Sequence, residues 1–191
     1  MTDIRLDGRL SAVAGAVRQG KRVADVGCDH GRLICSLALS GHIPSGIACD
    51  LREGPLKSAA ALIREMDLTE KIDTRLCNGL SGVRPEEADD IVIAGMGGET
   101  IIAILAGAAW LRDGEKQLVL QPQTKEALLR RWLWGNGFAI TRERGVEAGR
   151  FAYTVMTARY CGIRREADEW EALVGLLPKE TDAGSRAVLR R

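Results

Sequence analysis

The chain has 191 residues, of which 46% are hydrophobic and 28% charged, and its net charge is +1. A chain of this length and composition can bury a complete core as one folded domain, which excludes an intrinsically disordered protein. The balanced charge excludes a broadly basic nucleic-acid-binding protein but leaves room for a local basic patch.

The predicted elements alternate between helices and strands along most of the chain. A leading helix is expected over residues 5–20, where Leu10, Val13 and Val17 recur at helical spacing and Gly20 provides a stop. Short apolar runs predict strands, and amphipathic runs between them predict helices. In chain order these are strands at 22–27, 45–50, 72–77, 90–94 and 117–121, and helices at 32–40, 54–66, 99–106 and 125–134. This alternation favours a parallel sheet.

The last part of the chain follows a different pattern. Two strand-like runs, 138–147 and 151–160, are joined too closely for an intervening helix, which predicts an antiparallel hairpin at one edge of the sheet. We therefore expect an α/β fold that resembles the Rossmann-like class I methyltransferases, with a mostly parallel seven-stranded sheet and a C-terminal antiparallel hairpin. Residues 1–161 are predicted to form this domain, and residues 162–191 a tail with one short helix and a frayed end.

The cysteines and the N-terminus bear on metal content and location. The five cysteines are odd in number and contain no CxxC pair. This pattern favours reduced, buried thiols over a disulfide framework or a zinc site, so no metal is expected. The charged N-terminal segment is unlike a signal peptide, and no apolar run approaches the ~20 residues of a membrane span. We therefore expect a cytoplasmic protein that does not enter a membrane.

The most informative segment is VADVGCDHG at residues 23–31, where a buried strand runs into a glycine turn and then a helix. Such a turn presents backbone N–H groups at the carboxyl edge of the sheet, where open α/β sheets bind ligands. Gly27 would let the backbone approach a ligand, and Gly31 would begin the helix. Glycines at such a turn also meet ordinary steric needs, so this segment alone does not identify a ligand.

A second acidic residue limits the classes of ligand that could bind at this turn. Asp50 ends the next strand about twenty residues later, where a carboxylate can accept hydrogen bonds from ribose hydroxyls. The dinucleotide fingerprint GxGxxG is absent, because Asp29 stands at its second glycine. A carboxylate there would repel a pyrophosphate but not the sulfonium cation of S-adenosylmethionine, which is therefore favoured over NAD. Asp29 and His30 are the candidate catalytic residues, although His30 could equally orient the loop.

Two further segments are weaker signals. Asn78 and Gly79 follow the third predicted strand, where a side-chain amide could face an adenine edge or simply form an ordinary turn. The run GMGG at 95–98 follows the fourth predicted strand, and its glycines indicate unusual torsions or the close approach of a substrate. A tight loop without a ligand would explain the same run.

Together these segments resemble the bacterial tRNA (adenine-22-N1)-methyltransferases. The resemblance spans residues 10–160 and is carried, in order, by VADVGCDHGRL, CDLREGPLKSA, RLCNGLSGV, IVIAGMGGETI and LVLQPQTKEALLRRWL. Its most specific feature is a D-H dipeptide in the first turn combined with GMGG after the fourth strand. The resemblance implies S-adenosylmethionine as cofactor and methyl transfer to N1 of adenine 22, and hence tRNA as the partner.

The resemblance also assigns roles by position. Asp25, Gly27, Cys28 and Gly31 would hold the methionine end of the cofactor, and Asp50 with Leu51 would hold the ribose. Asn78 with Gly79 would contact the adenine, while Gly95, Met96, Gly97 and Gly98 would border the methyl-transfer site. The sequence departs from the family at Gln123, where Asn commonly follows the matched Gln121 and Pro122. Family members continue into a long helical C-terminal domain that helps to grip tRNA. Since this sequence stops at Arg191, it is expected to lack that domain.

Three other interpretations stay open at the level of the sequence. A nicotinamide-dependent oxidoreductase would need a phosphate-compatible glycine turn, which this sequence does not show. A methyltransferase could act on another RNA or a small molecule, and a non-catalytic module could keep the fold and only bind. The candidates for contacts with RNA are Arg5, Arg9, Arg32 and Arg52 for phosphates, and Phe151 and Tyr153 for a stacked base.

Overall fold

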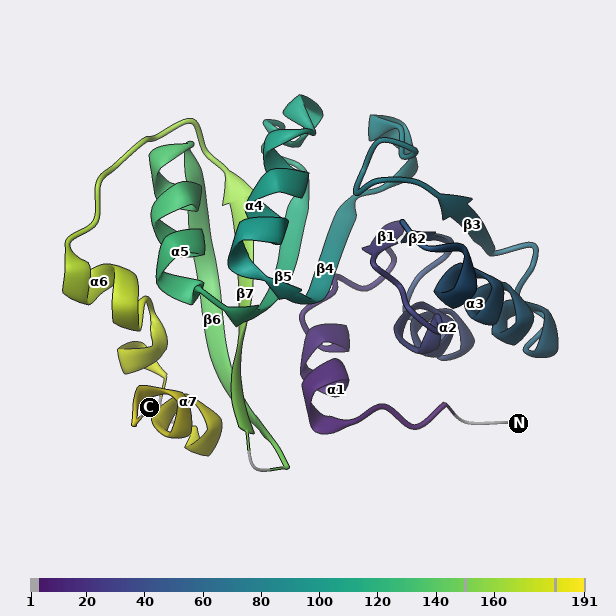
Figure 1. Cartoon of the computed structure of the whole chain (residues 1–191), viewed down its shortest axis with the longest axis horizontal. Helices are drawn as coiled ribbons and strands as arrows, with labels where there is room; N and C mark the ends of the chain where they lie inside the picture. The colour runs from purple at the N-terminus through teal and green to yellow at the C-terminus, as the bar shows by residue number, and fades with distance from the viewer. Residues whose placement is uncertain (1–3, 150, 181, 191) are drawn as a thin grey trace. The chain divides into compact units, whose positions relative to one another are not determined.

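The computed structural model describes residues 4–149, 151–180 and 182–190 (Figure 1). They belong to two compact units, Met1–Val92 and Ile93–Arg191. The boundary falls inside strand β4, Asp90–Gly97, which contributes residues to both. The strand order is β3 (Ile72–Leu76), β2 (Gly46–Asp50), β1 (Val23–Val26), β4, β5 (Gln117–Thr124), β7 (Phe151–Tyr160) and β6 (Phe138–Ala148), which confirms the predicted seven-stranded sheet. The predicted division into 1–161 and 162–191 follows a different criterion and stays a prediction.

The first unit contains the βαβ arrangement that the sequence predicts. Strand β1 pairs with β2, and β2 with β3, in parallel. All residues of β1 and β2 are buried, as expected for strands covered on both faces. Helices α2 and α3 contact these strands (Figure 1). The elements are α1 (Gly8–Ala14), β1 (Val23–Val26), α2 (Arg32–Leu39), β2 (Gly46–Asp50), α3 (Glu53–Glu65), β3 (Ile72–Leu76) and the 3₁₀ turn η1 (Pro85–Glu87).

The leading helix is shorter than the predicted 5–20, because both ends are set by local hydrogen bonds. Asp7 is the N-cap, and its side chain accepts a hydrogen bond from the backbone N–H of Leu10, so the preceding residues lie outside the helix. At the other end, the N–H groups of Ala16 and Val17 bond three residues back, to Val13 and Ala14. This tightened turn ends α1 well before Gly20.

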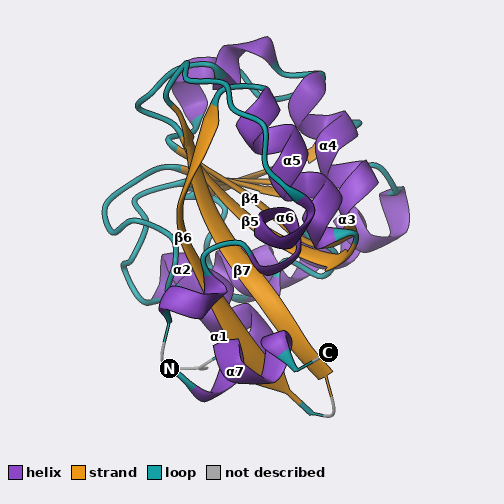
Figure 2. Ribbon diagram, turned by 90° about the vertical axis from the view of Figure 1, so that its left-hand side faces the viewer, coloured by secondary structure: helices purple, strands orange, loops and turns teal. Residues whose placement is uncertain are grey.

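The second unit contains the predicted antiparallel hairpin. Strand β7 pairs antiparallel with both β5 and β6, and β6 is one of the two edge strands of the sheet, which confirms the predicted position of the hairpin. The long twisted ribbon of β6 and β7 is seen in Figure 2. The elements are α4 (Gly98–Ala106), η2 (Ala109–Leu111), β5 (Gln117–Thr124), α5 (Glu126–Gly135), β6 (Phe138–Ala148), β7 (Phe151–Tyr160), α6 (Glu169–Val174), η3 (Leu177–Lys179) and α7 (Ala183–Leu189).

The prediction of a frayed end is wrong for the described part of the tail. After α6, which the sequence predicted, α7 packs against β6 and β7 (Figure 2). Gly184 and Gly145 bring two main chains together, because a Cβ on either would overlap the backbone of the other segment. The hydroxyl of buried Ser185 accepts a hydrogen bond from the N–H of Gly145 at 2.9 Å. These glycines carry no periodic apolar signal, so the docking of α7 could not be predicted from the sequence.

Among the described residues, no helix is long and apolar enough to cross a membrane.

Candidate functional site

The turn between β1 and α2 has an unusual backbone. Gly27, Asp29 and Gly31 all have positive φ values, of +75°, +51° and +70°. The N–H groups of Gly27 and Cys28 both donate to the carbonyl oxygen of Cys49 on β2, at 2.8 and 2.9 Å. Because non-glycine residues rarely adopt positive φ, the conformation of Asp29 is a strained feature of the kind that is common at functional sites.

Gly31 is required here by packing. It is the N-cap of α2, and a Cβ at this position would lie 3.0 Å from the Cβ of Ala59 on α3. Its left-handed backbone adds a second constraint against a side chain. The prediction that Gly31 begins the helix is therefore confirmed in its structural part, and its contact with a ligand stays a prediction.

Asp50 organises the carboxyl ends of the first three strands. Its side chain is 6% exposed and accepts hydrogen bonds from the N–H groups of Asp29, at 3.3 Å, and Arg52, at 2.9 Å. Its carbonyl oxygen accepts from the N–H of Cys77, just after β3. The structure thus brings Asp50 together with the glycine turn, as the sequence indicated.

The candidate catalytic pair lies at the surface of this turn. The side chains of Asp29 and His30 are 62% and 61% exposed, and Nε2 of His30 lies 3.7 Å from Oδ2 of Asp29. Both are open to a ligand from solvent. Leu51, the residue after Asp50, is also exposed.

Cys28 is buried, and its environment disfavours a thiolate. Burial raises the pKa of the Cys28 thiol, and the Asp25 and Asp50 carboxylates raise it further. A thiol of this kind is a poor nucleophile. Cys28 therefore contributes to this turn through its backbone N–H and its packing.

Asp25 is a carboxyl group with an altered pKa. It lies on β1, is 4% exposed, and has its pKa raised from the ordinary 3.8 to about 7, first by burial and then by the nearby Asp50 carboxylate. Between about pH 4 and pH 7 the Asp25 carboxyl keeps a proton in the folded protein that it has released in the unfolded chain. The stabilisation that this proton gives is complete below about pH 4 and is lost as the pH rises through about 7.

We expect Asp25→Asn to flatten the pH dependence of stability. The wild-type free energy of unfolding should fall between about pH 4 and 7 by at most about 1.4 kcal/mol per pH unit from this group. Asparagine cannot ionise, so the variant should lack this slope. Urea denaturation across this range measures both profiles, and Asp73→Asn, at an exposed carboxylate, is the control. Parallel profiles for wild type and Asp25→Asn would contradict the assignment.

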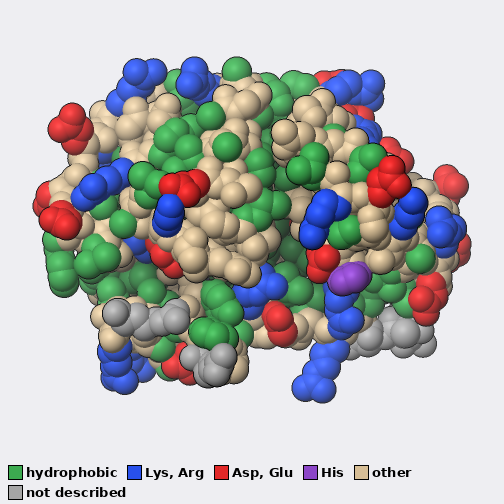
Figure 3. Space-filling model, viewed as in Figure 1, with side chains coloured by type: hydrophobic (Ala, Val, Ile, Leu, Met, Phe, Trp, Pro, Cys, Tyr) green, Lys and Arg blue, Asp and Glu red, His purple; other side chains and the backbone are tan. Residues whose placement is uncertain are grey.

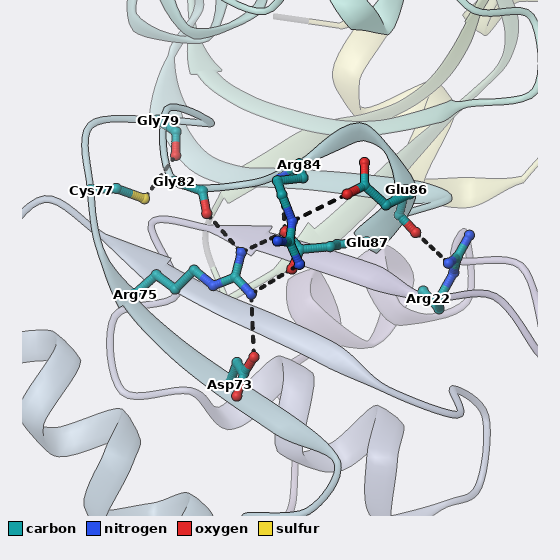
Figure 4. A network of polar contacts seen from close by, with 9 residues as sticks. All are labelled: Arg22, Asp73, Arg75, Cys77, Gly79, Gly82, Arg84, Glu86 and Glu87. Atoms are coloured by element: carbon teal, nitrogen blue, oxygen red, sulfur yellow. Dashed lines mark hydrogen bonds and ion pairs between the residues drawn. The ribbon is translucent and has the colours of Figure 1, made fainter.

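The loop that carries Asn78 and Gly79 is held by a charged network (Figure 4). The guanidinium of Arg75 on β3 donates to both carboxylate oxygens of Glu87, at 2.7 and 2.8 Å, and to the carbonyl oxygen of Gly82 at 2.7 Å. The hydrogen bond from Arg75 lowers the pKa of Glu87 to about 2, with further help from the N–H of Arg84. The 77–87 loop is thereby tied to β3.

The sequence did not reveal this network, because its charges are twelve residues apart and follow no helical or strand period. Asn78 itself is exposed, and Gly79 adopts a φ of +58° that suits glycine. Its carbonyl oxygen lies within hydrogen-bonding distance of the Cys77 thiol, at 3.4 Å. The structure therefore supports a specific turn at Asn78 and Gly79, while the proposed contact with adenine stays a prediction.

The GMGG run belongs to the second unit and differs from its prediction. Strand β4 continues to Gly97, and β5 continues to Thr124, three residues beyond each predicted end. Gly95 has a φ of +80°, as its sequence suggested. Gly98 has a structural cause instead: a Cβ there would lie 2.6 Å from the carbonyl oxygen of Lys125. Close approach of a neighbouring main chain, rather than of a substrate, explains that glycine.

Among the described residues, no group of three or more His, Cys, Asp or Glu side chains is arranged to hold a metal ion.

Comparison with known proteins gives consistent results. The profile of a family described as "Methyltransferase domain" matches residues 6–156. The tRNA (adenine(22)-N(1))-methyltransferase of Bacillus subtilis is 34% identical over 158 residues, which cover 83% of this chain and 66% of that protein. A putative tRNA methyltransferase of Mycoplasma pneumoniae is 35% identical over 150 residues, covering 78% and 68%. The chain therefore spans about two thirds of the length of these relatives.

A solved structure extends the likeness to the fold. Streptococcus pneumoniae Sp1610, a putative tRNA (m1A22) methyltransferase in complex with S-adenosyl-L-methionine, has a TM-score of 0.88 and 32% sequence identity. The alignment covers 97% of this chain and 87% of that one. The predicted Rossmann-like methyltransferase fold is confirmed by this match.

Proposed function

Since the chain belongs to the tRNA (adenine-22-N1)-methyltransferase family of methyltransferase domains, we propose that it transfers a methyl group from S-adenosylmethionine to N1 of adenine 22 in tRNA. The observation that carries this proposal is the left-handed turn of β1 and α2, anchored to β2 beside a buried Asp50. A solved relative with this fold holds S-adenosylmethionine.

The cofactor is proposed to lie at the carboxyl ends of the strands of the first unit. Asp50, with Leu51, would bind the ribose, because a carboxylate at the end of β2 can accept hydrogen bonds from two hydroxyls. The turn would receive the methionine end through Asp25, Gly27, Cys28 and Gly31, and Asn78 with Gly79 would contact the adenine. Gly95, Met96 and Gly97 are proposed, from the resemblance alone, to border the methyl-transfer step.

The proposed reaction requires mainly that adenine N1 and the methyl group of S-adenosylmethionine be aligned. The lone pair of adenine N1 attacks the methyl carbon, the bond from carbon to sulfur breaks, and the sulfonium becomes the neutral thioether of S-adenosylhomocysteine. The base must be unpaired to expose N1. Because N1 is neutral and nucleophilic, no proton has to be removed before attack, and positioning supplies much of the rate.

Asp29 is proposed to act on the charge that the reaction creates. As the methyl group arrives, positive charge develops on the adenine ring and its exocyclic amine. The exposed carboxylate of Asp29 can accept a hydrogen bond from that amine and so stabilise the charge in the transition state. His30, 3.7 Å from it, is proposed to orient the carboxylate.

The tRNA itself is the proposed partner, and arginines near the turn are the candidates for phosphate contacts. The guanidinium of Arg32 donates to the carbonyl oxygen of Arg5 at 2.7 Å, which places these two residues together. Arg52 lies beside Asp50 and is largely exposed. Positive and negative side chains are mixed over the face shown in Figure 3, so binding would depend on such local groups, which also include Arg9.

The proposal is tested by binding and transfer measured on the same samples. We expect calorimetry to show saturable binding of S-adenosylmethionine, and mass spectrometry of digested tRNA to find 1-methyladenine only when adenine is present at position 22. Binding without transfer would contradict the acceptor, and no binding would contradict the cofactor. A tRNA with guanine at position 22 is the matched substrate control.

Asp29→Asn tests the role of the carboxylate. Asparagine tolerates the left-handed conformation, so the turn should keep its shape while its charge is lost. We expect kcat to fall about 10²-fold, the usual cost of removing one transition-state hydrogen bond. Asp73→Asn, at another exposed carboxylate of the same unit, should keep wild-type kcat. Equal rates for Asp29→Asn and wild type would remove Asp29 from the mechanism.

A further inference from the structure

The side chain of Gln121 connects two neighbouring strands, β4 and β5. Gln121 lies on β5 in the second unit and is fully buried, with 0% of its surface exposed. Its Oε1 accepts a hydrogen bond from the N–H of Gly95 at 3.1 Å, and its Nε2 donates to the carbonyl oxygen of Pro122 at 2.8 Å. One amide thus links β5 to the residue on β4 that has a positive φ.

The hydrogen bond from the Gly95 N–H to Gln121 holds an unusual backbone conformation of Gly95. Gly95 has a φ of +80°, a conformation that glycine adopts readily but does not hold by itself, because it also populates the other regions. In this conformation the Gly95 N–H points at the Oε1 of Gln121, so the hydrogen bond favours it over the other conformations that glycine can adopt. Fixing Oε1 in turn needs a partner for Nε2, which the Pro122 carbonyl supplies.

The other end of the same segment is fixed by main-chain contact. A Cβ on Gly98 would lie 2.6 Å from the carbonyl oxygen of Lys125, so the two backbones are in contact. The ammonium group of Lys125 forms an ion pair with Glu99 at 2.6 Å. Met96 and Gly97 therefore lie between two anchors, the Gln121 hydrogen bond on one side and the Gly98 contact on the other.

We propose that Gln121 is a positioning residue for methyl transfer, because it fixes the backbone of Gly95, Met96 and Gly97 through the Gly95 N–H. This inference rests on the proposed function, in which those three residues border the transfer step. A displaced segment should still allow cofactor and tRNA to bind but should misalign the methyl group and N1. Misplacement by about 1 Å can cost about 10²-fold in rate.

The test compares Gln121→Met with wild type. Methionine has nearly the same length and fills the site but cannot make either hydrogen bond. We expect kcat to fall ten- to a hundred-fold, on the order of the cost of such a misplacement. The dissociation constant for S-adenosylmethionine and the KM for tRNA should stay within about threefold, because neither ligand is proposed to touch Gln121.

Gln117→Met is the matched control. Gln117 is also buried on β5 and accepts a hydrogen bond from Arg159 at 3.2 Å. It is the first residue of the strand, and the hydrogen bond from the Gly95 N–H goes to Gln121 instead. Both variants lose a buried amide of one strand, so a general loss of stability should affect them alike. Gln117→Met should keep kcat within twofold of wild type. Equal losses in the two variants, or a folded Gln121→Met with wild-type kcat, would overturn the proposal.

Hydrogen exchange of the Gly95 amide gives a readout that needs no turnover. The wild-type amide should be protected, and Gln121→Met should exchange it at least tenfold faster while the other β4 amides keep their rates. Unchanged exchange would overturn the proposal. If Gln121→Met fails to fold, Gln121→Glu is measured at about pH 4, because a buried carboxyl that stays protonated keeps both an acceptor for Gly95 and a donor for the Pro122 carbonyl. This variant should fold and keep the Gly95 amide protected, and loss of protection there would equally overturn the proposal. Absence of transfer by the wild type would instead count against the proposed function.

Discussion

Replacement of Asp50 by alanine should weaken the binding of S-adenosylmethionine about a hundredfold. Hydrogen bonds to a charged acceptor contribute about 1.5–3 kcal/mol each, and the loss of two ribose contacts corresponds to this factor or more. The structure adds a second reason. The carboxylate also holds the N–H groups of Asp29 and Arg52, so its removal loosens the turn that would receive the methionine end.

Two variants separate these contributions. Asp50→Asn keeps one acceptor for the backbone and loses the charge, so we expect it to bind the cofactor more tightly than alanine does and less tightly than wild type. Asp113→Ala removes one exposed carboxylate from the second unit and should bind like wild type. Calorimetric titration measures all four proteins, and wild-type affinity in Asp50→Ala would remove Asp50 from the cofactor site.

The first unit was largely predictable because its signals are local. Strands β1 and β2 are short apolar runs that end in turns, and every residue of both is buried, as such runs predict. Asp50 could be connected with the glycine turn because the carboxyl ends of adjacent parallel strands lie at the same edge of the sheet. Its hydrogen bond with the N–H of Asp29 is the geometric form of that prediction.

The features that sequence reasoning missed depend on partners far apart in the chain. In the sequence, Gln121 is the last residue of a predicted apolar strand. Only the structure shows that its side-chain amide accepts a hydrogen bond from the Gly95 N–H. Gly98 reads as part of a ligand loop, yet the carbonyl of Lys125 explains it. In both cases the partner is about 26 residues away, on β4 for Gln121 and at the N-cap of α5 for Gly98, beyond any periodicity in the sequence. Such contacts require the packed sheet to be known first.

A buried ion pair connects the C-terminal tail to the rest of the second unit, and it too could not be predicted from the sequence. Arg130 on α5 and Glu143 on β6 are 1% and 0% exposed, and Nε of Arg130 donates to Oε1 of Glu143 at 2.7 Å. The guanidinium also donates to the carbonyl oxygens of Ala172 and Leu173 at the end of α6, at 2.9 and 2.7 Å. The other oxygen of Glu143 accepts from the N–H of Leu176.

This arrangement makes the segment after β7 part of the second unit. The cation of Arg130 lies at the carboxyl end of α6, where the helix dipole favours positive charge, while Glu143 holds the chain just beyond it. Gly175 is required between them, because a Cβ there would overlap both side chains. In the sequence these charges look like ordinary surface residues, since charged side chains are rarely buried unless they are paired.

Glu143→Leu should therefore destabilise the protein by about 3–5 kcal/mol, because it leaves the guanidinium of Arg130 buried without its counter-ion. Arg130→Met should cost a similar amount, by leaving the Glu143 carboxylate unpaired. The double variant should recover much of the loss, since buried apolar side chains of similar volume often replace an ion pair at little cost. Urea denaturation of the four proteins gives the coupling free energy between the two sites. Hydrogen exchange should show α6 opening first in both single variants, and additive losses in the double variant would mean that the two charges do not stabilise each other.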